Sequence, residues 1–301
     1  MVLLGTTAII GILLSGILFG GILSLVGVGL TLIFGVTRVL NIAHGDFLVL
    51  GGIVSVILFD GLGLNPFLSL LIVIPLFAAT GVAFSFLMRR SMSAKTVEAS
   101  LASSVLVTLG LSNLIEGLAL RIVANFGFSI FAISLTIGTI TIVGVTIDDI
   151  LLISFAFIVA ISIAMTYIVY NTSFGALMRA SMTDREVASM LGADTNRVSM
   201  ITFAIGIALA ALSGTIYVVV TSVSANTGLL LTTDALTVVV LGGLGSFLGA
   251  LLGGFIIGIV SSIFEIVLTQ LNLPGTEWVS VVPIAILIIV LIVRPKGLFR
   301  R

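Results

Sequence analysis

Long apolar runs follow one another along almost the whole chain, and short polar segments between them hold most of the charged residues. A helix needs near 20 residues to cross about 30 Å of hydrocarbon, and most of these runs are close to that length. Helices also satisfy all of their own backbone hydrogen bonds, as a membrane requires. The pattern therefore predicts an all-α, polytopic transmembrane bundle. About eight spans are expected, near 13–36, 47–59, 66–88, 99–118, 150–170, 198–219, 246–269 and 278–293.

Three further stretches complete the predicted layout. The apolar run 235–241 is too short to cross a membrane, and Gly242, Gly243 and Gly245 follow it, so we expect a re-entrant half-helix there. Residues 122–148 are rich in Ile, Thr and Phe in partial alternation, which predicts a small extracytoplasmic hairpin. The first 20 residues lack a basic segment, which favours an interfacial or extra helix over a cleaved signal peptide. With no long linker, residues 1–301 are expected to form a single permease domain.

Composition excludes several classes of protein. Hydrophobic residues make up 59% of the chain and charged residues 8%, so too few ionic groups exist to cover a soluble globule. Twelve basic residues balance twelve acidic ones, so nothing favours nucleic acid as a partner. The absence of cysteine excludes disulfides and thiolate metal sites, and the lone histidine leaves no plausible zinc site. We expect no metal and no cofactor.

The basic residues predict the orientation, since cytoplasmic loops are enriched in Lys and Arg. They gather in alternate loops and at the tail: Arg89, Arg90, Lys95, Arg179, Arg185, Arg197, Arg294, Lys296, Arg300 and Arg301. The remaining loops carry only one basic residue, Arg121. Their acidic residues are Asp60, Asp148, Asp149, Asp234 and Glu277. The predicted N-terminus is outside and the predicted C-terminus is cytoplasmic.

Two polar interruptions of the apolar pattern, at 41–46 and 242–246, indicate a substrate path, because unwound backbone is tolerated only where protein or water satisfies it. Helix capping is the alternative role for the charged residues of the first interruption. Glu116 and Glu265, in or near the ends of spans, are alternative proton-relay residues of a pump. The candidate path residues are Thr31, Asn41, His44, Asp46, Asn113, Gly242, Gly243 and Gly245.

The longest polar interruption is the 171–197 segment. Thr183 and Glu186 have the spacing of a capping box, and Gly192 can take the left-handed conformation that ends a helix. We therefore expect a helix at 184–191, roughly 12 Å long, outside the bilayer. Its apolar residues Val187, Met190 and Leu191 fall on one face.

Enzyme chemistry finds little support in the sequence. The chain has only two lysines, Lys95 and Lys296, and neither stands in a Walker frame, so the chain itself is not expected to hydrolyse ATP. No nucleophile with a nearby base stands out. Transport fits better, with energy from an ion gradient or from a separate ATPase.

Glu186, Ala188 and Gly192 match the E-x-A-x-x-x-G core of the loop by which permeases of ATP-binding-cassette (ABC) importers dock on their ATPases, although the Leu-Pro that often follows is absent. The wider sequence, including TRVLNIAHGDF, GALMRASMTDREVASMLGADTNR, VVLGGLGSFLGALLGG and RPKGLF, closely resembles the permeases of high-affinity branched-chain amino-acid uptake systems. The length of the chain and its NIAHGD segment are similar to those of the H-type subunit of these systems.

The resemblance implies an alternating-access permease for leucine, isoleucine or valine in a prokaryotic plasma (inner) membrane. The implied partners are an M-type second permease subunit, two cytoplasmic ATPases and an extracytoplasmic solute-binding protein. Urea or short amides are alternative substrates. A gradient-driven secondary transporter and a purely structural subunit are alternative functions, and a helix resting on lipid is the alternative for 184–191. The ATPase-docking residues implied are Asp184, Arg185, Glu186, Val187, Ala188, Met190, Leu191 and Gly192.

Overall fold

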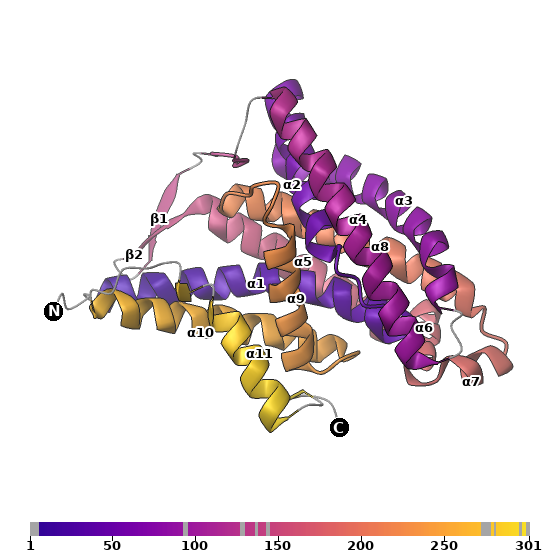
Figure 1. Cartoon of the computed structure of the whole chain (residues 1–301). Coiled ribbons are helices and arrows are strands. Elements are labelled where there is room, and N and C mark those ends of the chain that lie inside the picture. The colour runs from indigo at the N-terminus through magenta and orange to yellow at the C-terminus, as the bar shows by residue number, and fades with distance from the viewer. Residues whose placement is uncertain are drawn as a thin grey trace.

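The computed structural model describes residues 6–92, 96–126, 130–135, 138–142, 145–271, 278–279, 281–294 and 297–298 (Figure 1). Helices dominate this part of the chain. They are α1 (Thr6–Thr37), α2 (His44–Leu62), α3 (Pro66–Met92), α4 (Val97–Phe126), α5 (Asp149–Asn171), α6 (Ser173–Thr183), α7 (Arg185–Met190), α8 (Thr195–Val220), α9 (Gly228–Gly242), α10 (Phe247–Gln270) and α11 (Val281–Val293).

Seven helices of the described chain are long and apolar enough to cross a membrane, namely α1 to α5, α8 and α10. The predicted all-α membrane bundle is thus confirmed. The expected eighth span, 278–293, contains only the 13-residue helix α11, which is about 20 Å long and so shorter than the hydrocarbon layer. The half-helix is present as α9, but it begins at Gly228 and has 15 residues, so it is longer than predicted.

The first span is one continuous helix. From Thr6 the chain stays helical for 32 residues, so there is neither a separate nor an interfacial helix over 6–12; residues 1–5 lie outside the described part. α1 runs alongside α10 (Figure 1). Small residues allow this close approach: the Ser24 hydroxyl donates to the Leu251 carbonyl at 2.6 Å, and a Cβ on Gly254 would lie 2.3 Å from the Ser24 nitrogen.

The predicted hairpin is formed by β1 (Thr139–Ile142) and β2 (Val145–Asp148), an antiparallel pair in which Thr139 faces Asp148. It leads directly into α5. A separate bridge joins Phe131 to Val223, with backbone N–H to carbonyl distances of 2.8 Å in both directions. This bridge ties the segment before the hairpin to the end of α8.

The segment between α1 and α2 leaves helical conformation while it remains buried. It begins at Arg38, whose φ of 57° lies in the left-handed region, and Val39, Asn41 and Ala43 are fully buried. Its backbone is satisfied by hydroxyls of α4: the Leu40 N–H donates to Ser104 at 3.3 Å, and the Ile42 N–H donates to Thr108 at 3.2 Å. Non-helical backbone persists inside a membrane protein only where protein groups supply such partners.

Replacing Thr108 by valine is therefore expected to destabilise the fold by about 1–3 kcal/mol, because the partly buried Ile42 N–H loses its acceptor. Thermal unfolding of the detergent-solubilised protein measures the change. The control is Thr80→Val, since the Thr80 hydroxyl bonds only within its own helix, to the Phe77 carbonyl. Equal midpoints for the two variants would show that Thr108 does not support the segment.

Candidate functional site

The 171–197 segment folds into two short helices at the end of the bundle where α1 ends (Figure 1). α6 begins after Thr172, whose hydroxyl accepts from the Gly175 N–H at 3.0 Å. α7 follows after a single extended residue, Asp184. The chain then enters α8 behind a second cap, Asp194, whose carboxylate accepts from the Arg197 N–H at 3.0 Å. Thr172, Asp184 and Asp194 thus each cap the start of a helix.

The predicted capping box is wrong. Asp184 is the N-cap of α7, and its carboxylate accepts from the N–H groups of Glu186 and Val187 at 2.9 and 3.1 Å. Thr183 is instead the last residue of α6, and its hydroxyl donates back to the Arg179 carbonyl at 3.0 Å. Asp caps as well as Thr does, so the unforeseen helix α6 moved the boundary by one residue.

The predicted end of this helix is confirmed. Gly192 has a φ of 91°, its N–H donates to the Ser189 carbonyl, and the Ala193 N–H donates to the Ala188 carbonyl, both at 3.0 Å. This is a Schellman ending, which a glycine permits without strain. The helix has six residues, Arg185–Met190, in place of the expected eight.

α7 presents apolar side chains outward. Met190 and Leu191 are each 83% exposed and Val187 is 50% exposed, whereas Ala188 on the opposite face is 3% exposed. Partial burial lowers the pKa of Arg185 from its ordinary value, but a guanidinium keeps its charge at neutral pH. The helix therefore rests on the bundle through Ala188 and leaves an apolar face without cover.

α6 attaches this helix to the ends of two spans. The Arg179 guanidinium donates to the Val169 carbonyl at the end of α5 and lies over the Tyr170 ring at 5.5 Å. The Arg38 guanidinium, at the end of α1, donates to the Met182 carbonyl at 3.2 Å. α6 is thus hydrogen-bonded to the ends of both α1 and α5.

Three of the candidate path residues, Asn41, His44 and Asp46, lie at the start of α2, and Thr31 lies in α1. All four are buried. His44 Nε2 forms a hydrogen bond with the Val26 carbonyl at 3.1 Å, about two thirds of the way along α1. The Thr31 hydroxyl, both amide atoms of Asn41, His44 Nδ1 and one Asp46 oxygen have no hydrogen-bond partner among the described residues. α2 therefore starts deep inside the bundle at a polar cluster.

The other path candidates lie elsewhere. Gly242, Gly243 and Gly245 are at the opposite end of α9 from Gly228, which packs against Asp46, so about 22 Å of helix separates the two interruptions. Asn113 is on the exposed side of α4, where its amide donates to the Leu109 carbonyl at 2.9 Å. The eight residues do not form one site.

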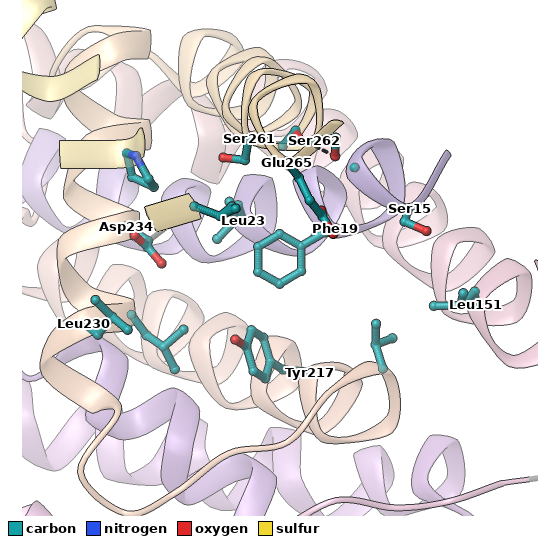
Figure 2. Close-up of a pocket in the computed structure, with 16 residues that line it drawn as sticks. Ser15, Phe19, Leu23, Leu151, Tyr217, Leu230, Asp234, Ser261, Ser262 and Glu265 are labelled. Carbon is teal, nitrogen blue, oxygen red and sulfur yellow. Dashed lines mark hydrogen bonds between the residues drawn. The ribbon is translucent and has the colours of Figure 1, made fainter. Parts of the chain in front are cut away.

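A cavity of about 440 Å³, which the sequence did not predict, lies elsewhere in the bundle. Figure 2 shows the residues that line it. Asp234 lies in α9 and lines this cavity, so its expected place in a loop is wrong. The spacing of Leu230, Leu231 and Asp234 at i, i+1 and i+4 was the only signal that they share a helical face. The other lining residues are Ser15, Gly16, Phe19, Leu23, Leu151, Tyr217, Val220, Gly258, Ser261, Ser262, Glu265, Val279 and Pro283.

Comparison with known proteins agrees with this architecture. The chain is 27% identical to a probable branched-chain amino acid transport permease protein LivH of Methanocaldococcus jannaschii, over 95% of this chain and 91% of the relative. It is 29% identical to the high-affinity branched-chain amino acid transport system permease protein LivH of Escherichia coli K12, over 95% and 94%. The relative BraD of Pseudomonas aeruginosa is 26% identical, over 96% and 95%.

Among solved structures, PsaBC from Streptococcus pneumoniae in complex with Fab has a similar fold, with a TM-score of 0.50 and 14% identity, over 94% of this chain and 91% of that chain. Residues 12–291 match the family described as the permease component of branched-chain amino acid transport systems. The match spans most of the chain, from α1 into α11. This multi-pass membrane protein therefore belongs to the family of branched-chain amino acid transport permeases.

Proposed function

We propose that the chain is the membrane-spanning subunit of an ATP-driven importer of leucine, isoleucine and valine, and that it has no catalytic activity of its own. The observation that carries this proposal is α7, a capped helix at one end of the bundle whose apolar face, Val187, Met190 and Leu191, is exposed. Such a face fits a groove on another protein. Membership of the permease family supports the substrate class.

Transport would proceed by alternating access. When ATP closes two ATPase subunits, α7 moves with them, and α6 passes the movement to α1 and α5 through the hydrogen bonds of Arg38 and Arg179. Residues Asp184 to Gly192 form the docking element in this scheme. In this scheme the buried polar cluster around Asn41 and His44 lies on or beside the substrate path. At the opposite end of α9, Gly242, Gly243 and Gly245 allow a close turn between α9 and α10.

The proposed orientation places α7 and the C-terminus in the cytoplasm and the N-terminus outside, in a prokaryotic plasma membrane. The loop charges support it, since Arg179, Arg185 and Arg197 lie in or beside the two short helices. Residues 1–301 would act as one permease domain. Its proposed partners are a second permease subunit, two ATPases and an extracytoplasmic solute-binding protein.

Reconstitution into liposomes with the partner subunits tests the function. Uptake of labelled leucine is expected to require ATP and to continue when ionophores collapse the ion gradients. Uptake without ATP that ionophores abolish would instead establish a gradient-driven transporter. Preferred uptake of labelled urea in the same assay would overturn the substrate class.

A further inference from the structure

The cavity of Figure 2 lies in the half of the bundle away from α7. Its walls come from the first half of α1, from α8 and α9, and from the second half of α10, with Pro283 of α11 beside them. At about 440 Å³ its volume is within the range of small-molecule sites. In the proposed orientation this is the extracytoplasmic half, where a delivered solute would enter.

The walls combine two kinds of surface. One is acidic and hydroxylic, with Asp234, Glu265, Tyr217 and the serines of α1 and α10; the other is apolar, with Phe19, Leu23, Leu230 and Leu231. Asp234 lies on the same side of the cavity as Leu23 and Leu230 (Figure 2). A carboxylate and a branched-chain surface are therefore available to one small ligand.

The charges on these walls are unbalanced. Asp234 and Glu265 are acidic, and none of the described residues that line the cavity is basic. Carboxylates inside a membrane protein are costly unless a cation or hydrogen-bond donors compensate them. A ligand that brings its own ammonium group supplies both.

We propose that this cavity binds a branched-chain amino acid, with the α-ammonium group on Asp234 and the side chain against Phe19, Leu23 and Leu230. This assignment rests on the proposed function, because it gives the proposed substrate a binding site inside the bundle. It also places a ligand on α9, whose second turn contacts α2 through the Thr232 hydroxyl, which accepts from the Gly45 N–H at 2.8 Å. Occupation of the cavity is thereby linked to the buried start of α2.

Binding of labelled leucine to the full chain in lipid nanodiscs tests the proposal. Unlabelled 3-methylbutylamine, which keeps the ammonium group, is expected to compete, whereas 4-methylpentanoate, which keeps only the carboxylate, is not. Asp234→Asn is expected to weaken leucine binding at least about 10-fold, since a charged hydrogen bond is lost. Trp278, the single tryptophan, adjoins the lining residue Val279, and its fluorescence is expected to change on binding.

The matched control is Asp60→Asn, an exposed carboxylate outside the cavity, which should bind leucine as the wild type does. The proposal is overturned if the wild-type chain shows no leucine binding at millimolar concentration, if 4-methylpentanoate competes as well as the amine, or if Asp234→Asn binds normally. The experiments distinguish failure of the two proposals. If ATP-driven uptake is intact but Asp234→Asn binds leucine normally, only the proposed binding site in the cavity is refuted. If the amine competes selectively but uptake does not require ATP, only the proposed importer function is refuted.

Discussion

Replacing Gly45 by alanine is expected to prevent the chain from forming a stable bundle. A Cβ at this position would lie 2.1 Å from the Gly228 carbonyl oxygen and 2.6 Å from the Thr232 nitrogen, both backbone atoms of α9. The Thr232 hydroxyl also joins α9 to the start of α2, because it accepts from the Gly45 N–H and donates to the Ile42 carbonyl, each at 2.8 Å. Overpacking costs about 1–3 kcal/mol where neighbours relax, and backbone neighbours relax least, so we expect a loss of at least about 3 kcal/mol.

Size-exclusion chromatography and thermal unfolding of the solubilised protein measure this effect. Gly117→Ala is the control, because the built Cβ at Gly117 of α4 has no neighbour within 4 Å and alanine favours the helix. We expect the control to elute and melt as the wild type does. A monodisperse Gly45→Ala protein with an unchanged midpoint would show that the starts of α2 and α9 are not in close contact.

Seven of the eight predicted membrane spans were predictable from the apolar runs alone, and the eighth, 278–293, was not. The helix α9 was predicted too short because Thr232, Thr233 and Asp234 interrupt its apolar pattern. In the fold the Thr233 hydroxyl donates to the Leu229 carbonyl one turn back in its own helix, at 2.9 Å. The Thr232 hydroxyl shares its proton between the Ile42 carbonyl at 2.8 Å and the Gly228 carbonyl of its own helix at 3.0 Å. Hydroxyls satisfied in this way remain inside membrane helices. Polarity along the sequence therefore did not distinguish a loop from a helix at this point.

The docking helix was predictable because its signals are local, whereas the cavity was not. A cap, an apolar face and a closing glycine stand within nine residues of one another, so the helix was found, although it was predicted one residue too long at each end and with Thr183 in place of Asp184 as its cap. The cavity draws Phe19, Tyr217, Asp234 and Glu265 from four helices that are far apart in sequence. Likewise, the distance between the two polar interruptions depends on α9, which begins beside the first interruption and ends at the second. Such proximities arise from packing, which the periodicity of one sequence does not contain.

Changing Met190 to aspartate is expected to abolish ATP-driven leucine uptake while the permease still inserts and folds. Met190 is 83% exposed on α7, so its replacement removes no packing inside the bundle. If this face fills an ATPase groove, a carboxylate there must be desolvated against an apolar surface, which costs about 2 kcal/mol or more, near 30-fold in affinity. Affinity capture of the partner ATPases and leucine uptake measure the two effects.

The neighbouring exposed residue Ser189 supplies the control for charge and helix position. Ser189→Asp adds the same carboxylate to the same last turn of α7, so it carries the same unfavourable interaction with the helix dipole but lies off the apolar face. Loss of ATPase capture in Met190→Asp with retention in Ser189→Asp would assign docking to the apolar face. If both variants retain ATPase capture and leucine uptake, α7 does not dock and the importer proposal loses its main support. If both variants lose capture and uptake, the loss is caused by the added charge or by an altered helix end, and docking is not assigned to the apolar face.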